Sequence, residues 1–195
     1  MSATPSGPAP AVPQVVYIVF IAEIVPQTVE SLIQALSNLA QKGVPEVYMA
    51  FSTPGGNVMH GITLYNFLRA VPFRLTIHNI GNVDSIGNAI FLGAQHRYAC
   101  AHSTFMFHGV GFDKPAARYE EKALREMLDG IGTDQRRIGS IITDRTNITQ
   151  DEVEGLFREA QTKTAEFARE RGMVHEIREL ELPPGAPVIS FVFQR

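Results

Sequence analysis

The chain has 195 residues, of which 45% are hydrophobic and 19% are charged, and its formal net charge is −3 at pH 7. This length supports one domain with a sizeable core and is short for two ordinary domains. The weakly acidic balance argues against a nucleic-acid partner, because phosphate-binding surfaces are normally basic. The single cysteine, Cys100, excludes an intramolecular disulfide and is typical of a reducing compartment, so we expect a cytoplasmic protein.

The start of the chain divides into a proline-rich segment and an apolar one. Residues 1–14 carry four prolines and no charge, so we expect a flexible Pro/Ala-rich tail before a single domain over residues 15–195. The apolar segment 15–25 is about half the length of a membrane span and contains Glu23. No positive charge precedes it, so we expect neither a signal peptide nor a membrane partner.

Strands and helices alternate through the first half of the chain. The run 47–51 is apolar almost throughout, which is typical of a strand buried on both faces of a parallel sheet. The expected elements are a strand at 15–21, a helix with Thr28 as N-cap that ends at Gly43, a strand at 47–51, a helix at 58–70, a strand at 73–80 and a helix at 86–94. Parallel strands joined by helices predict an α/β fold.

Longer helical stretches dominate the second half. The expected elements are a strand at 104–107, a helix at 115–145, a helix capped by Thr149 that runs to about residue 171 and is closed by Gly172, and a strand at 186–193. Gly130 and Gly132 interrupt the longest helical pattern, and each costs about 1 kcal/mol relative to alanine. We therefore expect a kink or a packing contact there.

A serine stands at the turn between the strand at 73–80 and the helix at 86–94, in the stretch Gly81-Asn82-Val83-Asp84-Ser85-Ile86-Gly87. A serine hydroxyl becomes a good nucleophile when a neighbouring base takes its proton. The first turn of a helix also offers free amides and the positive end of the dipole to a developing oxyanion. The alternative is that Ser85 or Asp84 only caps the helix.

Two other strand ends carry residues suited to the same chemistry. The pair Gly55-Gly56 can present a bare amide to a substrate carbonyl, or can form an ordinary turn after Pro54. His108 ends the strand at 104–107, at the rim where α/β sheets bind ligands, and an imidazole suits the role of general base. The alternative is a structural or solvent-facing role, which is the more frequent one for any single histidine among the six in the chain. Their spacing does not resemble a metal cluster, so we expect no metal and no cofactor.

Read together, three motifs resemble the Clp-type serine peptidases, the ClpP proteolytic subunit and its relatives in the ClpP/crotonase superfamily. They are Ser-Thr-Pro-Gly-Gly-Asn-Val, Gly-Asn-Val-Asp-Ser-Ile-Gly-Asn-Ala and Phe-Met-Phe-His-Gly, in this order, and similarity extends over most of residues 15–177. The resemblance implies that Ser85 is the nucleophile and His108 the general base. It also implies an oxyanion hole formed by the amides of Gly56 and Ile86.

The same resemblance implies an architecture and a set of partners. The fold would be a ClpP/crotonase-type spiral of parallel βαβ units with a long protruding helix. The chain would assemble into a homo-oligomeric ring that encloses a chamber, and it would cleave peptides or unfolded proteins. An ATPase unfoldase is a further possible partner.

Three departures from the family pattern bear on activity. Asp84 replaces a small residue, Gly109 replaces a glutamine, and Ala160 stands where the family has its catalytic aspartate, with Glu159 beside it. Loss of the orienting carboxylate costs a serine protease about 10⁴-fold in turnover. A catalytically weak or inactive scaffold subunit is therefore the second hypothesis. The third is a crotonase-type acyl-CoA enzyme, which shares the two-amide oxyanion hole but usually uses carboxylates as acid and base.

Overall fold

The computed structural model describes residues 12–112 and 118–192. Its elements are β1 (Val15–Ile21), α1 (Pro26–Gln41), β2 (Glu46–Thr53), α2 (Val58–Ala70), β3 (Arg74–Asp84), α3 (Gly87–Phe91), β4 (His96–Ala99), β5 (Thr104–Met106), α4 (Glu121–Arg145), α5 (Gln150–Glu159), β6 (Thr162–Thr164), α6 (Ala165–Glu170), β7 (Glu176–Ile177) and β8 (Val188–Val192). The expected tail, as far as residue 11, and residues 115–117 of the helix expected at 115–145 lie outside the described residues. Residues 118–120 are described and are not helical, so the expected helix began too early.

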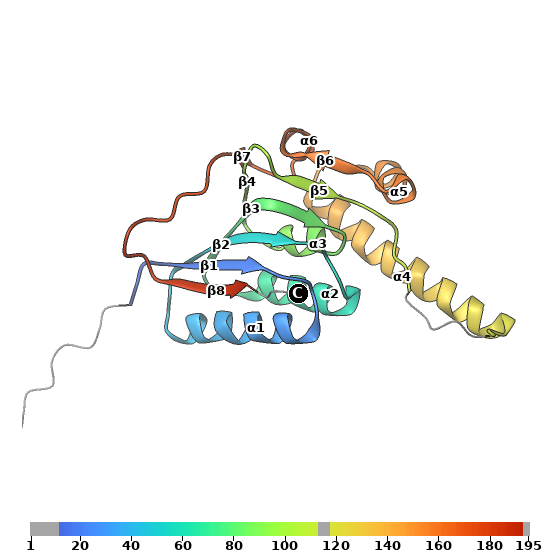
Figure 1. Ribbon diagram of the computed structural model, residues 1–195, viewed down its shortest axis with the longest axis horizontal. Coiled ribbons are helices and arrows are strands. Elements are labelled where there is room, and N and C mark those ends of the chain that lie inside the picture. Colours follow the sequence, from blue (N-terminus) through green and yellow to red (C-terminus); the bar gives the residue numbers. More distant parts are fainter. Residues whose placement is uncertain (1–11, 113–117, 193–195) are drawn as a thin grey trace, which may run out of the picture.

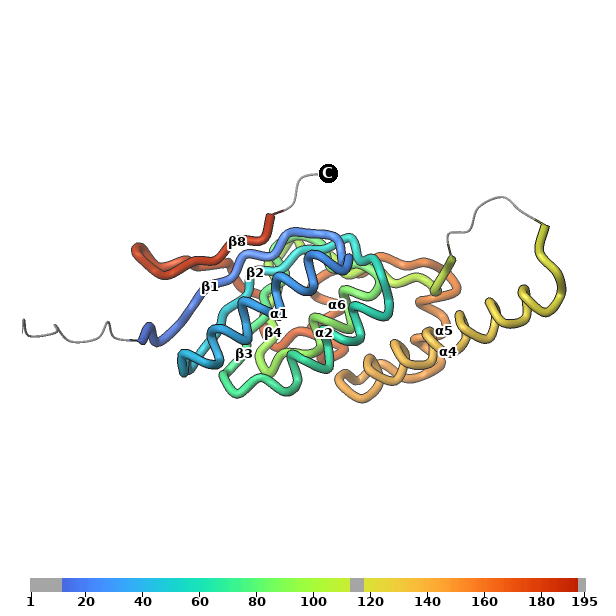
Figure 2. Tube along the Cα trace, turned by 90° about the horizontal axis from the view of Figure 1, so that it is seen from below, coloured from blue at the N-terminus to red at the C-terminus, as the bar shows by residue number. Residues whose placement is uncertain are grey.

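The strands form one mostly parallel sheet, and the prediction of an α/β fold is confirmed. Its order is β6-β5-β3-β2-β1-β8, with β4 pairing with β3 and β7, and only the β5–β6 pair is antiparallel among the described strands. Figure 1 shows α1 and α2 on one face of the sheet and α4 extending away from it. Figure 2, seen from below, shows α1 and α2 side by side across the strands.

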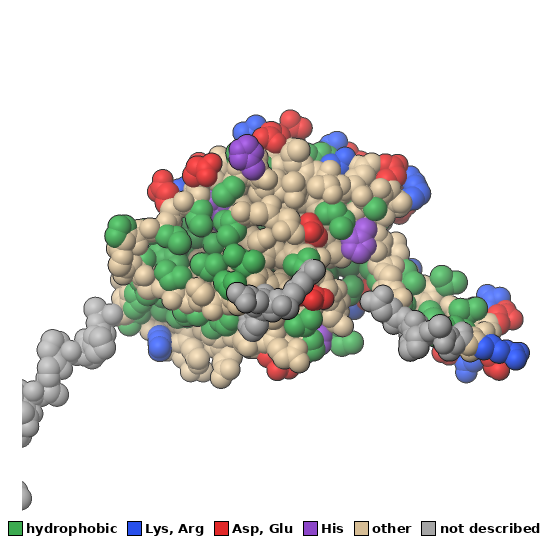
Figure 3. All heavy atoms as spheres, in the orientation of Figure 1, with side chains coloured by type: hydrophobic (Ala, Val, Ile, Leu, Met, Phe, Trp, Pro, Cys, Tyr) green, Lys and Arg blue, Asp and Glu red, His purple; other side chains and the backbone are tan. Residues whose placement is uncertain are grey.

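Alternate residues of the central strands build the core beneath those helices. Val16, Ile18 and Phe20 of β1 are buried, as strand periodicity requires for one covered face. Some apolar side chains stay at the surface, over β1, β8 and α4 (Figure 3). They include Ile21, Val188, Val192, Leu124 and Leu128.

β3 is longer than the sequence predicts, because it changes partners along its length. Its first half pairs with β4 over Thr76–Asn79, and its second half pairs with β5 over Asn82–Asp84. The expected end at residue 80 is therefore wrong. The strand passes Gly81 and delivers the chain to the Ser85 turn, directly beside β5.

The helix starting at Pro26 shows that the prediction of Thr28 as N-cap is wrong. Val25 occupies the N-cap position, and Thr28 lies in the first turn, where its hydroxyl accepts a hydrogen bond from the Val25 amide at 3.1 Å. The same hydroxyl donates to the Glu23 carbonyl at 2.7 Å. Thr28 therefore satisfies backbone groups at the start of α1 from a position within the first turn of the helix.

The expected helix over 149–171 is in fact interrupted. α5 ends at Glu159, Ala160 adopts a left-handed φ of 50°, and β6 pairs with β5 before α6 begins. By contrast, α4 runs without a break from Glu121 to Arg145. The expected kink is therefore wrong, and a Cβ on Gly130 would make only an ordinary contact with the ring of Phe112, at 3.5 Å.

Candidate active site

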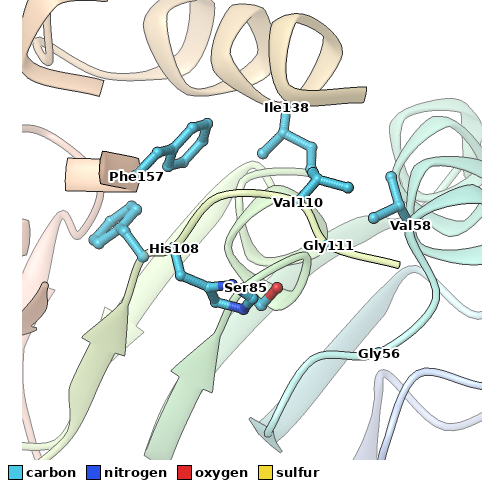
Figure 4. Close-up of a pocket in the computed structure, with 9 residues that line it drawn as sticks. Gly56, Val58, Ser85, His108, Val110, Gly111, Ile138 and Phe157 are labelled. Atoms are coloured by element: carbon cyan, nitrogen blue, oxygen red, sulfur yellow. The ribbon is translucent and has the colours of Figure 1, made fainter. Parts of the chain in front are cut away.

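Ser85, Gly56 and His108 line one cavity of about 90 Å³ beyond the carboxyl ends of β2, β3 and β5 (Figure 4). The other lining residues are Val58, Phe107, Val110, Gly111, Ile138 and Phe157. The carboxyl ends of neighbouring parallel strands meet at one edge of a sheet, so segments distant in the sequence converge here. Three of the four expected site residues thus share one cavity.

Ser85 occupies the sharp turn between β3 and α3 in a left-handed conformation, with φ 56°. Its amide donates to the Met106 carbonyl on β5 at 2.8 Å. α3 has Ile86 at its N-cap position and no side-chain cap, so Ser85 does not serve as the cap of this helix. Its hydroxyl makes no hydrogen bond to any residue that the structure describes, and it faces the cavity.

Neighbouring segments of the chain approach Gly55 and Gly56 so closely that neither position has room for a side chain. A Cβ on Gly56 would lie 2.3 Å from the Ile24 carbonyl oxygen, and one on Gly55 would lie 2.7 Å from Ser85 Cβ. Both glycines also have positive φ, 88° at Gly55 and 142° at Gly56. Since other residues rarely adopt such values, no other residue type suits this turn.

The local hydrogen bonds leave the amide of Gly56 free. The Ile24 amide donates to the Gly55 carbonyl at 2.7 Å, and the Asn57 amide donates to the Ile24 carbonyl at 2.8 Å. In a parallel bridge of this kind the middle residue, Gly56, directs its own amide away from its partner. That amide has no partner within the described ranges and is available to a ligand.

Ile86 is fully buried and is not among the cavity-lining residues, but its amide directly follows Ser85. The side chain packs against α2 so closely that a Cβ on Gly61 would lie 2.2 Å from Ile86 Cγ1. On the other side, a Cβ on Gly87 would lie 2.5 Å from Thr53 Cγ2. The turn is therefore wedged between α2 and β2, and the Ile86 amide bonds to no described residue.

His108 is oriented by its own neighbour along the chain. Its Nδ1 lies 2.7 Å from the carbonyl oxygen of Gly109. Because a carbonyl only accepts hydrogen bonds, Nδ1 carries the proton and Nε2 keeps a free lone pair. The imidazole is drawn beside Ser85 in Figure 4. No hydrogen bond joins the two side chains in this structure, and such bonds often form only when substrate binds.

The segment that contains Ala160 flanks His108. The Phe107 amide donates to the Gln161 carbonyl at 2.9 Å, and the Gly109 amide donates to the Phe157 carbonyl at 3.1 Å. Ala160 lies between these two acceptors along the chain. The neighbouring Glu159 is hydrogen-bonded to the Gln161 side chain. Among described residues, then, no carboxylate bonds to His108.

Asp84 brings a negative charge to the same side of the sheet. It pairs with Met106 across the β3–β5 ladder, and His108 follows two residues later, so side-chain alternation places both on one face. The side-chain amide of Asn82 donates a hydrogen bond to Asp84 Oδ2 at 2.6 Å. Burial raises the pKa of the Asp84 carboxyl, while that hydrogen bond and the nearby His108 act in the opposite direction.

One residue of this site was not anticipated. Asn88 is 1% exposed, and its side-chain amide donates to the carbonyl oxygens of Ser85 at 3.1 Å and Met106 at 2.8 Å. The available signal was a polar residue at the head of the otherwise apolar run 88–92. A buried polar side chain needs partners, and these partners belong to the segments that carry Ser85 and His108.

Two other site types find no support in the described ranges. No group of three or more His, Cys, Asp or Glu side chains is arranged to hold a metal ion. None of the described helices is long and apolar enough to cross a membrane.

The described sheet is mostly parallel, and its carboxyl edge carries a serine, a histidine and unpaired amides, which are groups suited to acyl transfer. Comparison with known proteins is more specific: the family model described as Clp protease matches residues 12–181. The chain therefore belongs to the Clp protease family, a family of peptidases, and the resemblance noted in the motifs is confirmed.

Two relatives illustrate this similarity. The proteolytic subunit 2 of the ATP-dependent Clp protease from Pseudomonas aeruginosa is 26% identical over 162 residues, which are 79% of this chain and 78% of that protein. Among solved structures, a ClpP1 mutant from Listeria monocytogenes matches with a TM-score of 0.73 and 20% identity. The match covers 84% of this chain and 91% of that chain, so the shared fold spans most of both.

Proposed function

We propose that this chain is a serine endopeptidase, in which Ser85 is the nucleophile and His108 the general base. The observation that supports it most directly is the single cavity shared by Ser85, His108 and Gly56. The amides of Gly56 and Ile86 form the oxyanion hole in this proposal. No cofactor or metal is needed for this reaction.

The chemistry follows from the tautomer of His108. Nε2 takes the proton of the Ser85 hydroxyl as its oxygen attacks the peptide carbonyl, and the negative charge develops on the carbonyl oxygen. The two free amides stabilise that oxyanion. The imidazolium then protonates the leaving amine. In the second half of the reaction His108 takes a proton from water, which attacks the acyl-enzyme, and returns the proton to the Ser85 oxygen as it leaves.

The walls of the cavity favour an apolar substrate side chain beside the scissile bond. Val58, Phe107 and Val110 line it together with Ile138 and Phe157, and none of these can pair with a charged group. Burying a charge against them would be costly, whereas burying a methylene group is favourable. The proposed substrates are peptides or unfolded proteins.

Assembly into a homo-oligomeric ring with an internal chamber is part of the proposal. The protruding helix α4 exposes Leu124 and Leu128, with 47% and 66% of their surfaces accessible. Large apolar side chains gathered on an extended helix favour contact with another copy. The Pseudomonas relative is named as ATP-dependent, and we infer that an ATPase unfoldase also delivers substrates to this chain.

A specific observation favours the second candidate function, a catalytically weak or inactive scaffold subunit. His108 is oriented by the Gly109 carbonyl and not by a carboxylate. A carbonyl fixes the ring but offers less stabilisation to an imidazolium than a full negative charge does. The crotonase-type alternative ranks last, because a serine and a histidine occupy the cavity where that class usually uses carboxylates.

Active-site labelling distinguishes these functions. A fluorophosphonate probe should modify Ser85 covalently, and the Ser85→Ala variant should lose both labelling and peptide cleavage. Ser37→Ala, a change of the same type on α1, should retain both. Cleavage by the pure protein excludes the scaffold role. An unchanged intact mass after long exposure to the probe rejects the peptidase and leaves the scaffold role, which mixed assembly with an active family member would then test.

A further inference from the structure

We propose that Asn88 is a positioning residue that fixes the nucleophile of this site relative to its base. It holds the Ser85 peptide in its left-handed conformation and ties that peptide to the strand that leads to His108. The inference rests on the proposed function, in which these two residues perform the chemistry. Asn88 itself does not line the cavity and does not touch the reacting atoms.

The orientation of the Asn88 side chain is settled by what surrounds it. Its two partners, the carbonyl oxygens of Ser85 and Met106, only accept hydrogen bonds. The NH₂ group must therefore face them, since the amide oxygen would meet two like dipoles. Asn88 Oδ1 has no hydrogen-bond partner in the described part of the chain, so this side chain forms hydrogen bonds only through its NH₂ group.

Both ends of the Ser85 residue are held by these contacts. A serine with φ 56° is in a region that L-residues avoid, and such a conformation persists only where the surroundings impose it. The Ser85 amide bonds to the Met106 carbonyl at 2.8 Å. The Ser85 carbonyl accepts from the backbone amide and from the side chain of Asn88, both at 3.1 Å.

The same donor group sets the spacing between the two catalytic segments. Asn88 bridges the turn that carries Ser85 and the carbonyl of Met106, two residues before His108. A displacement of about 1 Å between reacting groups costs on the order of 10²-fold in rate. The consequence of losing the bridge should therefore appear in turnover and not in substrate binding.

Two substitutions separate donation from space filling. Asn88→Ala removes the group, whereas Asn88→Asp keeps its shape and replaces the donors with acceptors. We expect kcat to fall about 10- to 100-fold in both, with KM within about twofold of the parent. Asn38→Ala, the same change on the exposed face of α1, should leave both constants unchanged. Full activity of a folded Asn88→Asp variant would show that only the volume matters, and would overturn the inference.

Hydrogen exchange read by mass spectrometry tests the anchor without any activity. In Asn88→Ala, the peptide covering residues 81–91 should exchange about 10-fold faster or more, while the β1 segment 15–21 stays protected. Unchanged exchange in residues 81–91 rejects the anchoring role. If the parent protein neither cleaves peptides nor reacts with the probe, but exchange changes as expected, the proposed peptidase fails and the anchor stands.

Discussion

The Nδ1 of His108 is bonded to the backbone carbonyl of the next residue, Gly109, at 2.7 Å. This contact selects the tautomer that a general base needs, with Nε2 unprotonated and free. It does not supply the negative charge that stabilises an imidazolium in the transition state. The proposed base, His108, is thus oriented but lacks a bonded carboxylate, which predicts low turnover for the isolated protein.

Restoring a carboxylate beside His108 should raise turnover. Ala160 lies in the segment that flanks His108, and its φ of 50° is better tolerated by aspartate than by alanine. We expect Ala160→Asp to increase kcat for peptide cleavage by roughly 10- to 10³-fold, measured with a fluorogenic peptide. Ala160→Asn, which shares the shape and the backbone preference but lacks the charge, is the matched control. Equal gains in both variants would mean that the charge is not the cause.

The proposed role of the Gly56 amide in the oxyanion hole can be tested by adding a side chain at this position. A Cβ at this position would lie 2.3 Å from the Ile24 carbonyl, so Gly56→Ala must displace the backbone that carries the free amide. We expect the rate of labelling by a fluorophosphonate to fall by about 10²-fold or more. Gly155→Ala is a suitable control, because nothing lies within 4 Å of its added Cβ. Labelling at the parent rate by a folded Gly56→Ala variant would remove this amide from the proposed oxyanion hole.

The sequence predicts most of this fold, because buried parallel strands leave runs that local patterns reveal. The run 47–51 and the helix pattern at 58–70 match β2 and α2 closely. The patterns could not indicate that β3 continues to Asp84, because that extension depends on pairing with β5. The helical pattern after Thr149 likewise hides the break at Ala160, which is imposed by pairing of β6 with β5.

The candidate site also combines residues that the sequence predicts with contacts that it cannot predict. Ser85, His108 and Gly56 are each readable as residues at strand ends, and their convergence follows from a parallel sheet. The role of Asn88 depends on which carbonyl groups it meets, and no local pattern contains that information. The Gly109 carbonyl is a backbone group, so no choice of residue type signals it.

The exposed leucines of α4 should govern assembly. Leu128 is 66% exposed, and a charge at an apolar contact would be buried without a partner. We expect Leu128→Lys to shift the mass measured by light scattering towards the monomer. Leu182→Lys, a change at a residue that is 44% exposed and lies outside α4, should leave that mass unchanged. Identical masses for the parent and Leu128→Lys would exclude this part of α4 from the proposed interface.

A buried histidine away from the cavity makes stability depend on pH. His78 is fully buried, with Nδ1 2.7 Å from the Tyr48 hydroxyl and Nε2 3.1 Å from the Arg178 carbonyl. Burial lowers its pKa to about 4, from an ordinary value of 6.5. Between these values the unfolded chain binds a proton that the folded protein does not. The free energy of unfolding is therefore at its full value, as far as His78 is concerned, above about pH 6.5. It decreases as pH falls towards 4, by up to about 3 kcal/mol.

Urea unfolding between pH 7 and pH 4.5 measures this loss. Replacing His78 by Gln keeps a polar group but removes the titration, so His78→Gln should be less stable at pH 7 and show a flatter pH dependence. His102→Gln, at an exposed histidine, should follow the parent curve. His175, whose pKa burial also lowers, contributes in the same direction and accounts for a residual slope. A curve for His78→Gln parallel to that of the parent would show that His78 is not the group being titrated.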